Sequence, residues 1–157
     1  MFAEEFKLIP LMNSADVSTG ADVDSINMEG IHKITYLFTF GAVTTDITIT
    51  PMSGASAGTK TTAVPSRYAA GGAVIGTAVA GSASSCDVLA AWTSTATTVT
   101  LTAASNKFLV VEIDASAMTN TEPWLTLTVA ADSAGICHCV AIAEPRYTGN
   151  RSGTVLA

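Results

Sequence analysis

The feature that most constrains this chain is a strict alternation of apolar and polar residues with a period of two. It is clearest in the stretch HKITYLFTF at residues 32–40, where Ile34, Tyr36, Phe38 and Phe40 fall on one face. Successive side chains of a β-strand point to opposite faces, so this spacing predicts a strand with one buried face. The aromatic side chains supply the apolar surface of that face.

Shorter segments with the same character follow, separated by Gly, Pro and small polar residues. Together they predict an all-β chain that folds as one antiparallel β-sandwich or barrel-like (jelly-roll-like) domain with extended terminal arms. The segments expected to form these further strands are 45–50, 61–68, 87–92, 97–102, 107–113, 124–130 and 136–143.

The two strongest neighbouring segments, 32–40 and 45–50, are separated only by a short link that begins at Gly41. A short link between two alternating segments is typical of a β-hairpin. We therefore expect these strands to pair with each other. We expect the second strand to stop at Pro51, because proline cannot donate a hydrogen bond to a strand ladder.

Two short turns are also predicted. Residues 25–30 are expected to form one helical turn that ends at Gly30, because glycine favours the end of a helix. Asp114 is expected to cap a helical turn that reaches Met118, because an aspartate side chain can accept a hydrogen bond from the first turn.

Charge excludes several functional classes. The chain of 157 residues has 7 basic and 13 acidic residues, for a net charge of −6. It therefore lacks the basic footprint of a nucleic-acid-binding protein and is not attracted to anionic lipid. No apolar run reaches the roughly 20 residues of a membrane helix, and the start MFAEEFKLIPLMN lacks the basic region of a signal peptide. We expect a soluble protein made in the cytoplasm, with no nucleic-acid or membrane partner.

Three cysteines, Cys86, Cys137 and Cys139, give no complete disulfide framework. Cys137 and Cys139 flank His138 in a segment predicted to be a strand, so the two thiols share one face and the imidazole lies on the other. This arrangement does not converge on one ion. We expect reduced, buried cysteines and neither a metal nor another cofactor.

Other candidate sites for chemistry are weak. The chain has no nucleophile elbow, phosphate-binding loop or zinc-protease motif. Asp22 and Asp24 are spaced like the start of a calcium loop whose other ligands are missing. Glu112 and Asp114 share one strand face without an opposing acid. We predict that the protein is not an enzyme, with a small hydrolase of unrecognised site as a remaining alternative.

Aromatic and arginine residues give two further alternatives. Trp92 and Trp124 either stack on sugars or pack in the core or an interface. The dipeptides Arg67-Tyr68 and Arg146-Tyr147 either anchor a protein interface, for which Arg and Tyr are favoured, or simply end strands.

The two ends of the chain are predicted to be contact arms. We expect residues 1–12 to form an arm or an edge strand, 13–147 to form the β-sandwich, and 148–157 to form a tail, with Arg146-Tyr147 where the tail leaves the domain. The alternative is that the first segment is an edge strand of its own sandwich and the second segment is disordered. The expected interface residues are Phe2, Phe6, Leu8, Ile9, Arg67, Tyr68, Arg146 and Tyr147.

Five stretches of this sequence, taken together, resemble the small head decoration, or cement, proteins of tailed bacteriophages. The similarity is one of pattern: a short turn, a histidine followed by an aromatic strand, an Ala/Thr/Gly-rich middle, and Pro-Arg-Tyr near the end. The stretches are EEFKLIPLMN, DSINMEGIHKITYLFTFGAVTTDITIT, KFLVVEID, WLTLTVA and AIAEPRYTGN.

This resemblance implies a structural virion protein that binds the outer surface of a phage head and stabilises it. The implied partner is the major capsid protein, the implied oligomer is a homotrimer, and no catalytic residue is carried over. A β-sandwich module that binds carbohydrate or a receptor on a phage tail or fibre is the alternative.

Overall fold

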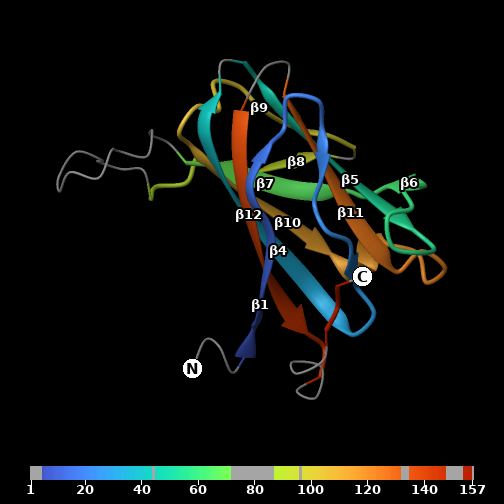
Figure 1. Cartoon of the computed structure of the whole chain (residues 1–157). Coiled ribbons are helices and arrows are strands. Elements are labelled where there is room, and N and C mark those ends of the chain that lie inside the picture. Colours follow the sequence, from blue (N-terminus) through green and yellow to red (C-terminus); the bar gives the residue numbers. More distant parts are fainter. Residues whose placement is uncertain are drawn as a thin grey trace.

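The computed structural model describes residues 5–43, 45–71, 87–95, 97–131, 135–147 and 154–156. Over these residues the chain forms two antiparallel sheets in separate layers (Figure 1). The prediction of an all-β, sandwich-like single domain is confirmed. Sheet A contains, in spatial order, β1 (Lys7–Asp16), β12 (Gly135–Pro145), β4 (Ile31–Val43), β10 (Phe108–Asp114), β7 (Ser66–Ala70) and β8 (Thr93–Thr95).

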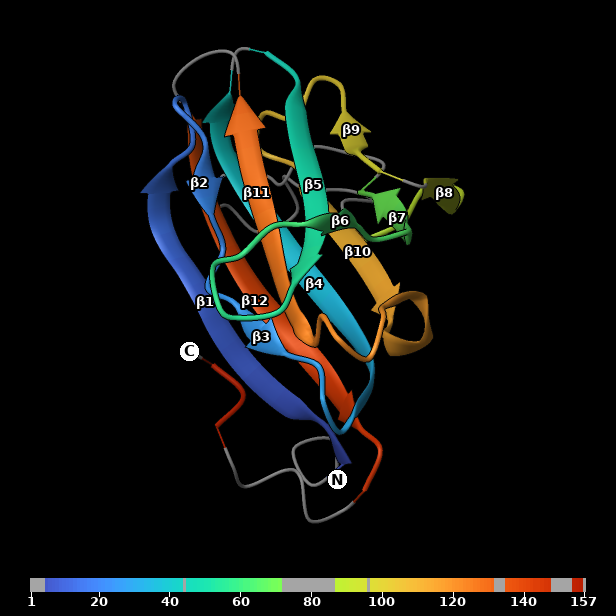
Figure 2. The ribbon, with the colours of Figure 1, turned by 90° about the vertical axis from the view of Figure 1, so that its right-hand side faces the viewer.

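Sheet B is the smaller layer, and Figure 2 shows it in front of sheet A. Two short strands share each of its edges: β2 and β3 pair with β11, while β6 and β9 pair with β5. Its strands are β2 (Ala21–Asp22), β3 (Ile26–Asn27), β11 (Trp124–Ala131), β5 (Ile47–Gly54), β6 (Thr62–Ala63) and β9 (Val99–Leu101).

The strand order is that of a jelly roll. The row β1-β12-β4-β10 in sheet A faces the row β2-β11-β5-β6 in sheet B, and the chain passes repeatedly from one sheet to the other. A jelly roll is a double-sheet fold of this kind, built from two Greek keys. Strands β7, β8 and β9 are additions inserted between β6 and β10.

The core lies between the sheets and is centred on β4. Its alternation is as predicted: Ile34, Tyr36 and Phe38 are fully buried and Phe40 is 3% exposed, whereas Leu37 on the other face is 38% exposed. The rings of Tyr36 and Phe38 stack with centroids 6.1 Å apart, and those of Phe38 and Phe40 with centroids 6.2 Å apart. Sheet B contributes fully buried aliphatic side chains from its two central strands, namely Ile47, Ile49, Leu125, Leu127 and Val129.

The predicted hairpin is wrong. Strand β4 pairs with β10 and β12, whereas β5 pairs with β11 in the other sheet, so the short link between β4 and β5 crosses the sandwich. The prediction that Pro51 ends the second strand is also wrong, because β5 continues to Gly54. Pro51 lies at the end of the stretch that pairs with β6, and its carbonyl accepts a hydrogen bond from the Val64 backbone N–H at 3.0 Å. The strand continues through Pro51 because this carbonyl still takes part in pairing, although the proline nitrogen cannot donate.

Residues 25–30 do not form the predicted helical turn. They contain β3 and then a tight turn, in which Asn27 Oδ1 accepts a hydrogen bond from the Glu29 backbone N–H at 2.8 Å. Gly30 closes the turn with a φ of 82°, a conformation that glycine adopts readily. The predicted cap at Asp114 is confirmed: it precedes the 3₁₀ helix η1 (Ala115–Ala117), with Met118 as C-cap.

Two other expected strands differ in extent. The segment 61–68 is divided into β6 and β7, because the chain leaves sheet B and enters sheet A at Val64 and Pro65. Residues 87–92 contribute one bridge, between Leu89 and Gly71, and β8 begins only after Trp92.

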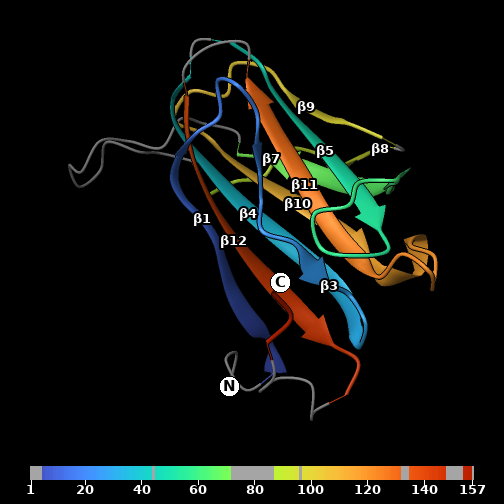
Figure 3. The ribbon, with the colours of Figure 1, turned by 45° about the vertical axis from the view of Figure 1, so that its right-hand side comes forward.

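The end of the chain packs on its own domain. The Asn27 backbone N–H donates to the Val155 carbonyl at 2.8 Å, and Leu156 forms a β-bridge with Ile26. Figure 3 shows this end beside β3. Both side chains pack against the core, so the prediction of a free tail through residue 157 is wrong for residues 154–156. Residues 148–153 lie outside the described part.

The two described cysteines are buried on the inner face of β12, as predicted. Cys137 and Cys139 are 0% and 1% exposed, and both thiols are free. Burial raises the pKa of Cys137 to about 12, and burial followed by the proximity of Cys137 raises the pKa of Cys139 still further. Both groups are therefore neutral thiols at physiological pH, the form that is a poor metal ligand and a poor nucleophile. Cys86 lies outside the described residues.

We predict that Phe38→Ala lowers the free energy of unfolding by about 3–5 kcal/mol, because it removes a fully buried ring from the centre of the core. The matched control is Leu37→Ala, one residue away on the outer face, for which we expect about 1 kcal/mol or less. Urea unfolding of both variants measures the difference. Equal losses would mean that the faces of β4 are assigned incorrectly.

Candidate protein-docking surface

The outer face of sheet A is unusually apolar for a surface turned away from the core. One row crosses the sheet through directly paired residues: Pro10 on β1, Val140 on β12, Leu37 on β4 and Val110 on β10. Directly paired residues lie on the same face, so these side chains form a continuous band. The row ends at Ala69 on β7, which is buried.

The neighbouring row joins residues from distant parts of the chain. It runs through Leu8, Ile142, Thr35, Glu112 and Arg67. Leu8 is 63% exposed at the apolar end of this row, and Arg67 stands at the charged end. We define the aliphatic patch as the apolar outward side chains of both rows: Leu8, Pro10, Leu37, Val110, Val140 and Ile142.

Three of the predicted interface residues lie on this face. Phe6 borders a 290 Å³ hollow together with Ile142 and Thr35, and Leu8 and Arg67 belong to the second row. Two other predicted interface residues are turned toward the core: Ile9 is 2% exposed, so that prediction is wrong, whereas Tyr68 is half-buried and packs against the core, and its place in an interface stays a prediction. Their neighbours in the sequence point outward because the strand alternates.

Phe2 lies outside the described residues, and β1 continues to Asp16, past the boundary expected at residue 12. The first segment is thus an edge strand of its own sandwich from Lys7 onward, paired with β12.

Arg146 and Tyr147 follow β12, away from the patch. The Arg146 guanidinium donates through Nε to the Ile31 carbonyl at 3.1 Å, and its backbone N–H donates to Gly30 at 2.8 Å. These bonds fasten the end of β12 to the start of β4. The side chain of Tyr147, next to Arg146, is 70% exposed to solvent.

Charged groups gather at one end of the same face, around Glu112. The Arg67 guanidinium forms a hydrogen-bonded ion pair with the Glu112 carboxylate, and the Lys33 ammonium lies 4.0 Å from its other oxygen. The Glu112 side chain is 14% exposed, so the pair is partly shielded from water. The two carboxylates considered as an acid pair therefore have separate structural roles. Glu112 interacts with Arg67 and Lys33, and Asp114 caps η1.

The carboxylates expected to resemble a calcium loop also have other partners. Asp22 accepts hydrogen bonds from Lys60 at 2.9 Å and from Thr128 at 2.6 Å. Partial burial acts to raise its pKa, but these bonds and the Lys60 charge outweigh it and hold the pKa below its usual value. Asp24 accepts from the Ser25 backbone N–H at 3.0 Å. The His, Cys, Asp and Glu side chains of the described residues form no group of three or more that could hold a metal ion.

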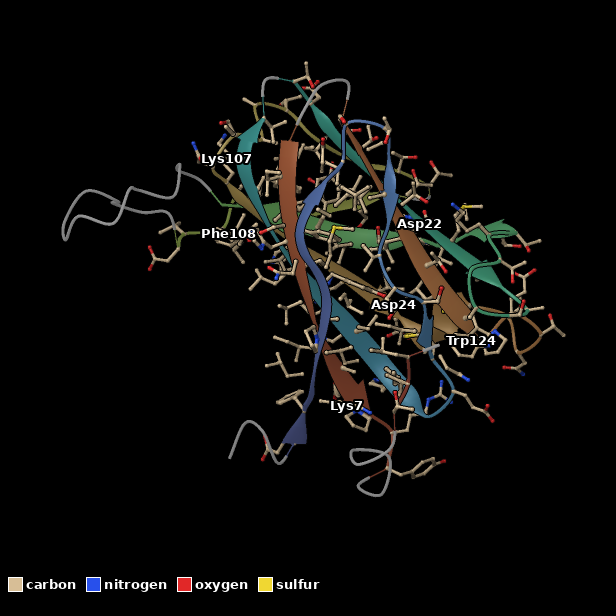
Figure 4. All side chains as sticks on the ribbon, viewed as in Figure 1. Lys7, Asp22, Asp24, Lys107, Phe108 and Trp124 are labelled. Carbon is tan, nitrogen blue, oxygen red and sulfur yellow. The ribbon has the colours of Figure 1, made fainter. Side chains whose placement is uncertain are left out.

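The two tryptophans lie in different settings. Figure 4 shows Trp124 with Asp22 on the sheet B side of the molecule, and Phe108 on the opposite side. Trp124 begins β11 and is half-buried. Trp92 is 43% exposed, and the Arg67 guanidinium carbon lies 4.9 Å from the centroid of its ring.

Most of the aliphatic patch was not among the predicted interface residues. The sequence signal that could have identified the patch is an aliphatic residue on the strand face where alternation predicts polar residues. Leu37 in β4 and Val110 in β10 are such residues. Leu37 interrupts the outward series of Lys33, Thr35 and Thr39, but its partners become apparent only from the strand pairing.

Comparison with known proteins supports the fold and not a family. No protein-family model matches the chain, and no curated protein matches it. Among solved structures, the crystal structure of SPBc2 prophage-derived protein YomS is similar in fold, with a TM-score of 0.51 over 88% of this chain and 92% of that chain. The sequence identity is 9%, so the similarity shows the fold alone. No helix among the described residues is long and apolar enough to cross a membrane.

We predict that Asp114→Ala destabilises the protein by about 0.5–1 kcal/mol at neutral pH, because the Asp114 carboxylate accepts the Ser116 backbone N–H at 2.8 Å. Hydrogen bonds from Ser116 lower the pKa of Asp114 in the folded state. Its contribution is therefore complete above the unfolded-state pKa of about 3.9 and declines as the pH falls through the lower, folded-state pKa.

Urea unfolding of wild type and Asp114→Ala between neutral and acidic pH should show the difference in stability shrinking below about pH 3.9. Asp114→Asn is the matched control, since asparagine keeps an acceptor but cannot titrate. A stability difference that stays constant down to the lowest pH would contradict the role of the carboxylate.

Proposed function

We propose that this chain is a structural protein of a bacteriophage virion, a decoration or cement protein that binds the outer surface of the head. Its partner in this proposal is the major capsid protein, and its place of assembly is the host cytoplasm. The role is mechanical stabilisation of the shell, without catalysis or a cofactor.

The observation that carries the proposal is the aliphatic patch. Contiguous exposed apolar side chains with a polar border are typical of protein-interaction surfaces. Among its members, Leu37 is 38% exposed and Leu8 is 63% exposed. The patch lies on a sheet face, which offers a broad, even surface and suits attachment to another folded protein.

The fold is compatible with this role. Jelly rolls are frequent in viral capsid proteins, although they also occur in lectins and cupins. The structure similar in fold is described as prophage-derived. A fold alone does not determine function, so the proposal depends on the surface and on the sequence pattern shared with decoration proteins.

A symmetric oligomer would strengthen binding to the shell. A homotrimer would bring three copies of the patch to one site on the shell, so that contacts that are individually weak reinforce one another through effective concentration. Deletion of residues 2–12, which would otherwise test an arm, removes more than half of strand β1 and is expected to unfold sheet A. Point substitutions on the patch are therefore the better test.

We predict that Leu37→Glu and Val110→Glu fold normally but bind the heads of the encoding phage at least about tenfold more weakly than wild type. A charge at the centre of an apolar contact loses burial and must be desolvated. Thr100→Glu, an exposed position on β9 of the other sheet, is the control and should bind like wild type. Binding is measured as occupancy of heads after sedimentation, with a thermal melt of each variant.

If the folded patch variants saturate heads with unchanged affinity, the patch is not the docking surface. If the wild type itself does not bind heads, the decoration role is wrong.

We also predict a homotrimer on the head or in solution, with a native mass near three times 16.0 kDa. Native mass spectrometry of the free protein and imaging of decorated particles report the number of copies at each site. A monomer in both states would rule out this part of the proposal.

A further inference from the structure

The edge strand of sheet A has an irregular stretch opposite a histidine. Strand β1 lies along β12 at this edge (Figure 1), and the register of the two strands is interrupted between Met12 and Ala15. Asn13 and Ser14 fall in this interruption and together stand opposite the single residue His138. Two residues opposite one define a β-bulge. Ser14 adopts the left-handed backbone conformation there, with a φ of 51°.

The backbone N–H of Ser14 donates to a side-chain base and not to a strand carbonyl. Its acceptor is Nδ1 of His138, at 3.2 Å, and the Ser14 hydroxyl lies 3.4 Å from Nε2 of the same ring. A backbone N–H can only donate, so Nδ1 carries no proton and Nε2 carries one. An unprotonated imidazole nitrogen within hydrogen-bond distance of an N–H is the arrangement of a general base.

The residue before this N–H is an asparagine, whose side chain can react with it. The backbone nitrogen that follows an asparagine can attack the carboxamide carbon, and a small following residue leaves that nitrogen accessible. Of the five asparagines in the sequence, Asn13 is the only one followed by serine or glycine. Asn13 and Ser14 are both exposed, so water reaches the site.

We propose that the Asn13-Ser14 pair is a site of spontaneous deamidation promoted by His138. The Ser14 nitrogen passes its proton to Nδ1 of His138 and forms a bond to Cγ of Asn13. The bond between Cγ and the side-chain nitrogen then breaks, and this nitrogen takes the proton from the imidazole and leaves as ammonia. The product is a cyclic succinimide, which water opens at either carbonyl to give aspartate or isoaspartate at position 13.

The modification changes the margin of the aliphatic patch. Asn13 and His138 line a hollow of about 490 Å³ together with Pro10 and Val140, which belong to the patch. In this hollow a neutral carboxamide is replaced by a carboxylate, and isoaspartate also adds a carbon to the backbone of β1. Ageing of the chain therefore adds negative charge beside the proposed docking surface. The reaction itself needs only this chain and water, so it does not rest on the proposed function.

The experiment is incubation of the full chain at neutral pH, below its melting transition, with peptide mass spectrometry at successive times. The measured quantity is the rate at which each asparagine loses its carboxamide nitrogen. Asn120, which is also exposed but is followed by threonine, is the internal control. We expect Asn13 to be modified faster than Asn120, because only Asn13 has a base on the attacking nitrogen.

Two variants test His138, because a hydrogen bond that only restrains the bulge would have the opposite effect. His138→Gln keeps an acceptor for the Ser14 N–H but is not a base, and His138→Ala removes both functions. If His138 is the base, both variants slow the modification of Asn13 by about tenfold or more and leave Asn120 unchanged. If the contact only restrains the backbone, His138→Ala frees the N–H and speeds the modification. Thermal melts verify that each variant is folded.

The proposal is overturned if Asn13 in the folded wild type is modified no faster than Asn120. It is also overturned if either folded variant modifies Asn13 at the wild-type rate or faster. Neither measurement involves phage heads, so failure of this site and failure of the docking surface give different results.

Discussion

The stack of Tyr36, Phe38 and Phe40 along β4 is the interaction on which the rest of the structure depends. β4 pairs with both β10 and β12, so its register determines the register of the centre of sheet A. A slip of one residue would turn the rings to solvent and Leu37 to the core, which is a costly exchange of burial. The stack even includes the hydroxyl of Tyr36, which is buried without a partner. Its desolvation opposes folding, and the ring burial around it must exceed that cost.

Because the aromatic rings fill the inner face of β4, the residues on its outer face are not needed for the core. Natural sheets usually carry polar residues on a solvated face. Here Leu37, Val110 and Val140 stand side by side across three strands, and the charged groups gather farther along the same strands, around Glu112. One face is thereby divided into an apolar part and a charged part.

The sequence was sufficient to predict which side of most strands is buried, because alternation is a local property. It predicted the aromatic face of β4, the inward cysteines of β12 and the cap at Asp114. It did not predict which strands pair. The link between β4 and β5 is as short as a hairpin loop, yet it crosses between the sheets, since a sandwich connection and a hairpin connection have similar length and composition. The Leu8 to Arg67 row was equally hidden, because it joins five strands through four long-range registers.

The same lack of information on strand pairing limited the prediction of single interface residues. Ile9 and Tyr68 were expected at an interface with Leu8 and Arg67, but adjacent residues of a strand cannot share a face, so at most one of each pair can lie on the outer surface. Alternation shows which of two neighbouring residues lies on the outer surface only when the inner face of the strand is known. The inner face of β1 is set by its pairing with β12, and that of β7 by its pairing with β10. The same pairing carries Leu8 and Arg67 to opposite ends of one row. The aliphatic patch and the charged group around Glu112 are consequently linked through the backbone of β4 and β10, which both contribute to each of them.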